Sequence, residues 1–297
     1  MKPKLSIIIT AFKEPNVDKA IDAIVKQNIP YEYELIVAAP DDATKHVVER
    51  FNKNYKQVRF FKDPGRGKSF ALNLVMQKLF GDIIIMTDGD VCLGENSIKE
   101  LVRPFENPKI GVVTGRVISI NERDNMLGYW SHMLCDAGAH SIRQELHDKA
   151  EFIECSAYLM ALRANIIGEF PLDVAEDAYI PYLFHKKGYR IAYAPNAHVL
   201  VKWPTNFKDW VKQKVRTAKA HETLDKYAPD FPRVKSFKNE LLQGWHRALS
   251  YPQTTKELAW TFPLFVARLY VWANVIADTK LKNKHYQDAW DRVSSAR

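Results

Sequence analysis

Short apolar runs alternate with amphipathic stretches along the first third of the chain. Four of these runs are rich in β-branched residues and predict strands at residues 5–11, 34–39, 58–61 and 82–87. The stretches between them have a helical period and predict helices at residues 17–26, 43–52 and 69–80. Strands that alternate with helices in this way are typical of an α/β fold with a mostly parallel sheet.

The middle of the chain predicts longer elements of both kinds. They are strands at residues 110–120, 152–162 and 189–193 and helices at residues 122–147 and 175–186. Gly188 is a helix-stop glycine between the last helix and the last strand. After Pro204 the pattern becomes helical and basic. We therefore expect a body of residues 1–203 followed by a helical extension of residues 204–297.

Composition limits the class of protein. A chain of 297 residues with 46% hydrophobic residues can bury a large core, which argues against disorder in any long part. Cys92, Cys135 and Cys155 are odd in number and widely spaced, which makes a disulfide framework or a zinc site improbable and favours a reducing cytoplasm. The first apolar run is too short for the core of a signal peptide, so we expect a first strand there.

The net charge of +8 is unevenly distributed. Residues 1–200 carry 25 Lys and Arg against 26 Asp and Glu, whereas residues 201–297 carry 18 against 9. Such a basic segment can contact nucleic acid or an anionic membrane. The apolar stretch 258–277 favours the membrane, and its aromatic residues belong at a headgroup boundary. Arg268 near its middle would cost roughly 2.5–3.5 kcal/mol in a span, so we expect an interfacial helix. The alternative is an ordinary core helix.

Two carboxylates follow the strand predicted at residues 82–87. Asp88 and Asp90 are two residues apart, and side chains at this spacing on an extended backbone point the same way. Ligands of open α/β sheets bind at the carboxyl ends of strands, and two hard oxygen donors suit Mg²⁺ or Mn²⁺ with a diphosphate. The alternative interpretation is a simple Asp-Gly turn.

Three further segments offer chemistry, although each alone has a structural explanation. Residues 7–15 are a strand that runs into a polar turn. Residues 63–73 form a Gly-rich turn with Arg66 and Lys68, which suits phosphate but does not match the P-loop spacing. Glu176 and Asp177 open a predicted helix, where the helix dipole alone favours acidic residues.

Taken in order, these segments resemble glycosyltransferase family 2, the inverting nucleotide-sugar enzymes with the GT-A fold. The resemblance covers about residues 1–217 and rests on Gly67–Asn73, Gly81–Asp90, Glu176-Asp177, Gly188–Val199 and Gln213–Thr217. The last two are similar to the hyaluronan, chitin and cellulose synthase branch, whose Gln-x-x-Arg-Trp motif has Thr217 here in place of Trp. The several membrane spans of that branch are not evident, so we do not expect processive synthesis through a self-made channel.

The resemblance implies a fold and a set of roles. The fold is a GT-A mixed sheet flanked by helices, with residues 1–203 as the catalytic domain and the helical extension after it. Asp177 is the expected general base, and Asp90 with Asp88 the expected ligands of Mn²⁺ or Mg²⁺. The expected donor-binding residues are Thr10, Ala11, Phe12, Glu14, Arg66, Lys68 and Asp88, with Asp41 or Asp42 in place of the family's Asp-Asp pair. The expected acceptor or diphosphate side is Glu176, Gln213 and Arg216.

The expected partners are a UDP-sugar, a lipid-linked or saccharide acceptor and an anionic membrane at its cytoplasmic face, without nucleic acid. His185, His198 and His221 rank low as ligands, because a lone His is more often structural. One alternative function is nucleotidylyl transfer, but that class has its Gly-rich turn directly after the first strand, where residues 11–15 contain no glycine. A second alternative is a non-catalytic protein that binds a membrane or nucleic acid through the basic extension.

Overall fold

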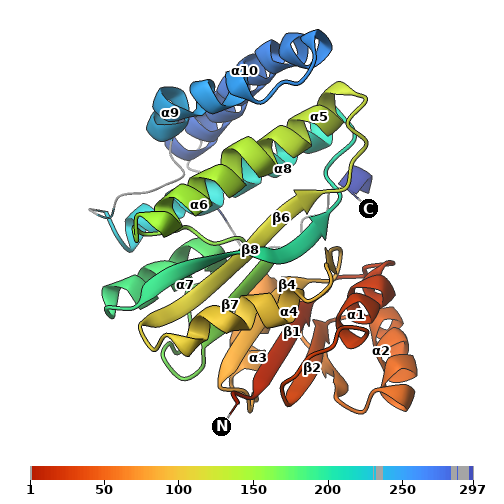
Figure 1. The fold of residues 1–297 in the computed structure, drawn as a ribbon. Helices are drawn as coiled ribbons and strands as arrows, with labels where there is room; N and C mark the ends of the chain where they lie inside the picture. Colours follow the sequence, from red (N-terminus) through yellow and green to blue (C-terminus); the bar gives the residue numbers. More distant parts are fainter. Residues whose placement is uncertain (1, 230, 232–236, 282–285, 287–293, 297) are drawn as a thin grey trace.

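A mixed β-sheet forms the lower half of the molecule in Figure 1. The computed structural model describes residues 2–229, 231, 237–281, 286 and 294–296. Within these residues the sheet has eight strands in the order β3-β2-β1-β4-β7-β6-β8-β5. The strands are β1 (Leu5–Thr10), β2 (Tyr33–Ala39), β3 (Val58–Lys62), β4 (Ile83–Asp88), β5 (Cys92–Leu93), β6 (Ile110–Ser119), β7 (Leu159–Arg163) and β8 (Arg190–Val201).

The direction of the strands changes at β7. On one side of it, β1 pairs in parallel with β2 and β4, and β2 pairs in parallel with β3. β7 runs antiparallel to both β4 and β6, and β6 then pairs in parallel with β8. The short β5 closes this edge antiparallel to β8. The parallel half is the one that the alternating sequence pattern predicts, and β7 makes the whole sheet mixed.

Helices cover both faces of the sheet because successive strand residues point to opposite sides. Ile7 and Ile9 of β1 pack into a core with α1, α2 and α4, whereas Ile8 packs into a second core with α3 and α7. The helices are α1 (Val17–Val25), α2 (Asp42–Asn54), α3 (Lys68–Met76), α4 (Ser97–Val102), α5 (Met126–Met133), α6 (Ser141–Asp148), α7 (Glu176–Lys186), α8 (Phe207–Glu222), α9 (Phe237–Ser250) and α10 (Thr255–Ile276). Short 3-10 segments are η1 (Arg103–Glu106), η3 (Thr223–Lys226) and η5 (Ser294–Ala296), and π-helical segments are η2 (Leu134–His140) and η4 (Ala277–Leu281).

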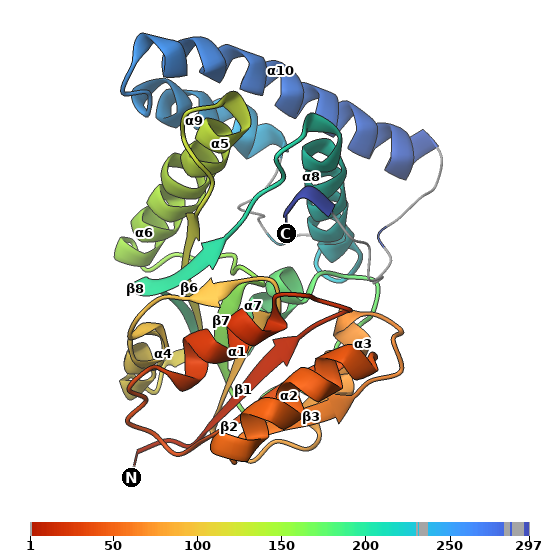
Figure 2. The same ribbon diagram turned by 90° about the vertical axis from the view of Figure 1, so that its right-hand side faces the viewer.

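A second layer of helices lies above the sheet. The segments α5, η2 and α6 form one long helical run, and α10 crosses above α5 and α8 (Figure 2). An aromatic and aliphatic core joins these helices, with Trp130 of α5 and Trp210 of α8 buried at its centre. The indole N–H of Trp130 donates a hydrogen bond of 2.7 Å to the carbonyl of Trp260. The face of α10 that points toward α5 and α8 is therefore part of a core.

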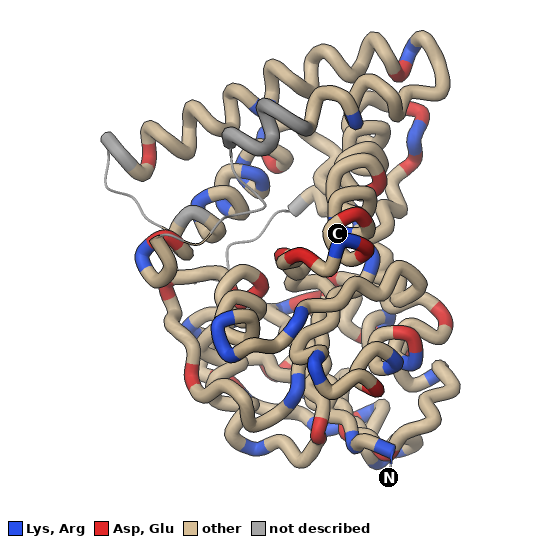
Figure 3. The backbone as a smooth tube through the Cα atoms, turned by 60° about the vertical axis from the view of Figure 1, so that its left-hand side comes forward, with Lys and Arg blue, Asp and Glu red and all other residues tan. Residues whose placement is uncertain are grey.

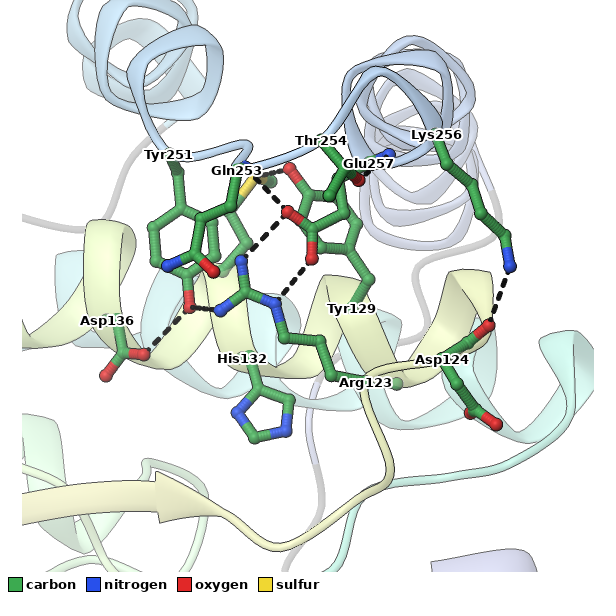
Figure 4. A network of polar contacts seen from close by, with 12 residues as sticks. Arg123, Asp124, Tyr129, His132, Asp136, Tyr251, Gln253, Thr254, Lys256 and Glu257 are labelled. Atoms are coloured by element: carbon green, nitrogen blue, oxygen red, sulfur yellow. Dashed lines mark hydrogen bonds and ion pairs between the residues drawn. The ribbon is translucent and has the colours of Figure 1, made fainter.

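A partly buried ion pair holds the start of α10 against the body (Figure 4). Arg123, just before α5, donates from Nε and Nη2 to the two carboxylate oxygens of Glu257, at 2.6 and 3.0 Å. Arg123 Nη1 also donates to Tyr251 Oη at 3.2 Å, and Tyr251 Oη donates to Asp136 Oδ2 at 2.9 Å. We call Arg123, Tyr251 and Glu257 the Arg123 clamp.

Four details differ from the sequence expectations. The strand expected at residues 152–162 begins only at Leu159, because the residues before it are buried without joining the ladder. The helix expected to reach residue 80 ends at Met76, and Gly81 lies so close to Ser6 that a Cβ there would be 2.4 Å from its nitrogen. The strand expected at residues 189–193 continues to Val201. Neither β5 nor α4 was expected.

Candidate active site

A cavity of about 1150 Å³ lies at the carboxyl ends of β1 and β4, between the sheet and the upper helices. Ligands of open α/β sheets bind at this edge. Thr10 and Asp88 line the cavity from the two strand ends, and Lys68 lines it from the start of α3. Glu176 and Asp177 line it from the start of α7. The structure therefore gathers residues from most of the predicted segments around one space.

Lys68 joins two of these elements. Its Nζ lies 2.6 Å from Asp88 Oδ1 and 2.8 Å from Glu176 Oε1. Burial lowers the pKa of Lys68, but the two carboxylates outweigh this effect and raise the pKa well above its usual value of 10.5. Gly65 and Gly67 have positive φ values of 72° and 126°, which a residue with a side chain rarely adopts, and they turn the chain into α3.

The turn after β4 brings both aspartates to the cavity. Asp88 ends the strand, and Asp90 lies in the following turn rather than on an extended backbone as expected. Thr10 Oγ1 donates to Asp88 Oδ1 at 2.9 Å, and the N–H of Gly89 donates to the carbonyl of Thr10 at 2.9 Å. A Cβ on Gly89 would lie 2.9 Å from that of Ala11, so this close approach requires glycine.

The carboxylate of Asp90 has a raised pKa. Its side chain is open to the cavity, but the surrounding protein reduces its access to bulk water. This desolvation, together with the charges of Asp88 and Glu14, raises the pKa of Asp90 to about 6, and Lys68 opposes the shift. A cation beside Asp90 would relieve this repulsion.

A divalent metal fits this donor set. In the described part of the chain, no group of three or more His, Cys, Asp or Glu side chains is arranged to hold a metal ion. Mg²⁺ and chemically similar ions are commonly bound through one or two carboxylates, with waters and substrate phosphates as the other ligands. Asp88 and Asp90 supply two hard carboxylates that line the cavity, which meets that requirement.

The acidic pair of α7 divides between two environments. Glu176 is 5% exposed and is held by Lys68. Asp177 is less buried, and its Oδ2 accepts a hydrogen bond of 3.2 Å from the N–H of Ala157. The same oxygen lies 3.8 Å from His221 Nε2. Asp177 can therefore present its other oxygen to the cavity.

One face of α8 forms a further wall. Residues at helical spacing line the cavity here, namely Gln213, Arg216, Thr217, Ala220 and His221. Gln213 Nε2 donates to Tyr158 Oη at 3.4 Å. Within the described residues, the buried Oε1 of Gln213 has no hydrogen-bond donor. A buried amide oxygen is costly without a partner, so a hydroxyl in the cavity would satisfy it.

Three of the predicted donor residues do not line the cavity. Asp41 accepts hydrogen bonds from the N–H groups of Lys13 and Thr44, at 2.8 and 2.9 Å, and thereby caps α2. Asp42 is exposed and pairs with Lys62. Arg66 lies over the ring of Phe70 at 4.1 Å. By contrast, Thr10, Ala11, Phe12 and Glu14 all lie at the cavity.

Several residues of the site were not predicted from the sequence. Tyr158 lies in the cavity wall, and burial raises its pKa, with further contributions from Asp90 and Asp88. Glu154 also lines the cavity and is 4% exposed. Gln213, Thr217 and His221 follow one another at intervals of four residues. This helical spacing was the signal that could have placed His221 on the same face of α8 as Gln213. No comparable signal marks Tyr158 or Glu154.

Similarity to solved structures defines the class of fold. A mannosyltransferase from Pyrobaculum calidifontis, solved with GDP-Man and Mn²⁺, superposes with a TM-score of 0.59 at 18% identity. The match covers 95% of this chain and 81% of that chain. The fold is therefore that of the GT-A glycosyltransferases, as the sequence predicted.

Family comparison is more specific. The protein-family model described as glycosyltransferase like family 2 matches residues 3–220, so the chain belongs to this family. An N-acetylglucosaminyltransferase from Rhizobium meliloti (strain 1021) is 22% identical over 245 residues, which are 73% of this chain and 55% of that protein. A poly-β-1,6-N-acetyl-D-glucosamine synthase from Staphylococcus epidermidis is 23% identical over 295 residues, which are 94% of this chain and 68% of that protein. The chain spans about half the length of the curated N-acetylglucosaminyltransferases that it matches. The resemblance to family 2 is thus confirmed.

Proposed function

We propose that this chain is an inverting glycosyltransferase that moves a sugar from a nucleoside diphosphate to an acceptor hydroxyl, with UDP-N-acetylglucosamine as the favoured donor. The observation that carries the proposal is that Lys68 bridges Asp88 and Glu176 beside Asp177 in one cavity. The names of the relatives support N-acetylglucosamine as the sugar. The bound Mn²⁺ of the mannosyltransferase supports a divalent metal.

Donor binding uses the end of the cavity formed by β1 and β4. Thr10, Ala11, Phe12 and Glu14 contact the nucleoside, and Lys68 and Arg216 neutralise the diphosphate. Asp88 and Asp90 would hold Mn²⁺ or Mg²⁺, and the bound ion would supply positive charge beside the diphosphate. Asp41, Asp42 and Arg66 lie outside the cavity and take part only if the donor reaches beyond it.

Transfer requires an acceptor hydroxyl between Asp177 and the sugar. Its oxygen attacks the anomeric carbon, the bond from that carbon to the diphosphate oxygen breaks, and Asp177 takes the hydroxyl proton. Attack opposite to the leaving group inverts the anomeric configuration. Glu176 and Gln213 orient the reactants, and the buried Oε1 of Gln213 supports a hydroxyl partner.

The acceptor side of the cavity is mostly apolar at its far end. Leu134 of η2 and Leu264, Phe265 and Trp272 of α10 line it there, with the charged Arg268 one turn after Leu264. π-Helical turns such as η2 often occur at functional sites. A polar end beside Asp177 and a mostly apolar end with one cation beside α10 suit an amphipathic molecule, which supports a lipid-linked acceptor over a free saccharide.

The position of α10 supports a membrane location. Within the described residues, one helical stretch, Thr255–Thr279, is long and apolar enough to cross a bilayer, and 33% of its most apolar window is buried. Arg268, the charge expected to disfavour insertion, lines the cavity instead of the outer face. We propose that this outer face docks on an anionic membrane at its cytoplasmic side, with residues 1–203 as the catalytic domain and residues 204–297 as a helical extension that completes the site.

Donor turnover tests the proposed function. Full-length protein with UDP-N-acetylglucosamine and Mn²⁺ should release UDP, with water in the place of the acceptor, and chelation should stop the release. UDP-, GDP- and dTDP-sugars should be compared by thermal shift, because a ligand of the native state raises the melting temperature. Pyrophosphate release from UTP and a sugar phosphate would instead identify a nucleotidylyltransferase. No turnover and no shift with any donor would favour a non-catalytic protein.

A further inference from the structure

We propose that His221 is a positioning residue for the general base, because it joins Asp177 to the buried carboxylate of Glu154. The inference rests on the proposed function, in which Asp177 takes the acceptor proton. His221 lies in the last turn of α8, and Glu154 lies in the segment that leads to β7. The three side chains therefore come from three different elements.

The geometry of the contacts gives His221 two acidic neighbours. Its Nδ1 lies 3.5 Å from Glu154 Oε2, and its Nε2 lies 3.8 Å from Asp177 Oδ2. Both His221 and Glu154 are 4% exposed, so water screens the interaction between the two side chains only weakly. Each ring nitrogen therefore lies within 4 Å of one carboxylate oxygen, which is ion-pair range but longer than a hydrogen bond. A small shift of either side chain would bring the ring N–H to hydrogen-bond distance.

The contacts on Asp177 indicate what this arrangement does. Within the described residues, the N–H of Ala157 and the ring of His221 both approach Oδ2. The ring thus fixes the rotation of the carboxylate and leaves Oδ1 to receive the acceptor proton. Glu154 acts one step further away, because it holds the imidazole ring in place. Misplacement of a reacting group by about 1 Å can cost a factor on the order of 10² in rate.

The experiment separates positioning from simple stabilisation. His221→Leu removes the imidazole ring from beside the buried carboxylate of Glu154 and should lower the melting temperature. His221→Leu combined with Glu154→Leu removes both charges and should recover much of that stability, because an apolar pair can replace a polar one. If His221 positions Asp177, neither variant should recover turnover.

The readout is UDP release from UDP-N-acetylglucosamine with Mn²⁺ by the full-length protein. We expect kcat to fall by about 10- to 100-fold in both variants, while the donor KM stays within about twofold. His221→Gln keeps an N–H that can reach Asp177 and should restore most of the loss. Lys219→Met is the matched control, since Lys219 lies on the same helix and pairs with Asp278 at 3.2 Å. It should keep the kcat of the wild type.

Three results would overturn the inference. The first is an unchanged kcat in His221→Leu, and the second is full recovery of both stability and kcat in the double variant. The third is an equal loss of donor binding and turnover, which would place His221 in donor binding. A wild-type protein that releases no UDP from any donor would instead overturn the proposed function, so the two failures are distinguishable.

Discussion

Asp88 and Asp90 are two residues apart, but their surroundings give them different properties. Asp88 accepts from Thr10 and pairs with Lys68, so its charge is compensated. Asp90 makes no hydrogen bond or ion pair with another described side chain, and its pKa is raised to about 6. A carboxylate that is repelled by its neighbours is one that a bound cation would stabilise most.

Replacing Asp90 by Asn should therefore change stability and metal response in opposite directions. The folded pKa of about 6 exceeds the usual 3.8, so ionisation of Asp90 reduces the stability of the metal-free protein as pH rises from about 4 to about 6. Asn removes this penalty. At pH 7 the metal-free variant should melt at the same temperature as the wild type or higher, and the gain from Mn²⁺ with UDP-N-acetylglucosamine should disappear.

The comparison needs a second Asp→Asn change away from the cavity. Asp148 is exposed near the end of α6, and Asp148→Asn should keep the full response to Mn²⁺. An Asp90→Asn protein that gains as much stability from Mn²⁺ and the donor as the wild type would show that Asp90 is not a metal ligand.

Asp177→Asn tests the base. Asn can still accept from the N–H of Ala157 and keeps the shape of the side chain, but it cannot take a proton. Donor affinity should stay near normal, while transfer should fall by a factor on the order of 10² to 10⁴. Calorimetric titration of the donor and single-turnover rates measure the two quantities separately. An equal fall in both would make Asp177 a donor-binding or structural residue.

At the scale of secondary structure, α10 depends on its contacts with α5. The Arg123 clamp fixes the first turn of α10, and Tyr129 Oη lies 2.8 Å from Thr261 Oγ1 one turn later. Both contacts are in buried or half-buried positions. The same face of α10 supplies Leu264 and Trp272 to the cavity, so a loosened α10 would also open the acceptor end.

Removing the cation of the clamp should show this dependence. Arg123→Met leaves Glu257, which is 7% exposed, without its bidentate partner. We expect a loss of about 1–3 kcal/mol in the free energy of unfolding and faster proteolysis between α9 and α10. The control is Lys256→Met, one residue before Glu257 in α10. It removes an exposed contact to the carbonyl of Asp124 and should change the free energy of unfolding by less than about 0.5 kcal/mol. Equal effects of the two substitutions would contradict the role of the clamp.

The sequence predicts elements best where local pattern and tertiary environment agree. The strands and helices of the parallel half follow from alternating apolar runs, because β1, β2 and β4 are buried on both faces and only the edge strand β3 is partly exposed. Residues 152–158 are also rich in apolar residues, but they run along the cavity, and no local pattern distinguishes such a segment from a strand. Likewise, an apolar helix packed on a body has the same composition as a membrane helix, so contacts alone reveal the buried face of α10.

The candidate site was predictable only in part for the same reason. Family motifs mark two pairs of acidic residues, each close together in sequence. They are Asp88 with Asp90 and Glu176 with Asp177. Their contacts with Lys68 and His221, and the hydrogen bond of Gln213 to Tyr158, join residues that are far apart along the chain, which a single sequence does not reveal. Asp41 and Asp42 match a family motif by position. However, Asp41 caps α2, and Asp42 pairs with Lys62.

At the scale of the whole molecule, both faces of α10 are apolar. One face packs on α5 and α8, and there Trp272 is buried although it was expected at a headgroup boundary. The outer face exposes a stripe without charged residues, made by Leu258, Phe262, Val266, Leu269, Tyr270 and Ile276. Most of the α10 tube is accordingly tan at the top of Figure 3. An apolar stripe of this length on an exposed surface is typical of a site that binds a membrane or a protein partner.

We predict that this stripe inserts into the surface of an anionic membrane. The wild-type protein should co-sediment at low salt with vesicles of phosphatidylcholine and phosphatidylserine. Each basic residue near the surface adds roughly 1 kcal/mol, so salt should weaken binding without abolishing the apolar contribution. The triple variant Phe262→Ser, Val266→Ser and Leu269→Ser removes apolar groups that are 57%, 68% and 52% exposed and should lose most of the binding.

The control must remove exposed apolar surface elsewhere. It then distinguishes non-specific hydrophobic binding to vesicles from binding through a defined docking face. Phe80, Ile120 and Leu172 are 46%, 55% and 38% exposed and lie away from α10, and their replacement by Ser should leave vesicle binding unchanged. Wild-type protein that ignores anionic vesicles at low salt would refute the membrane proposal. Equal binding by the two triple variants would do the same, because it would assign the contact to the basic residues alone. Loss in the α10 variant only would locate the membrane above the apolar end of the cavity, where a lipid-linked acceptor would enter.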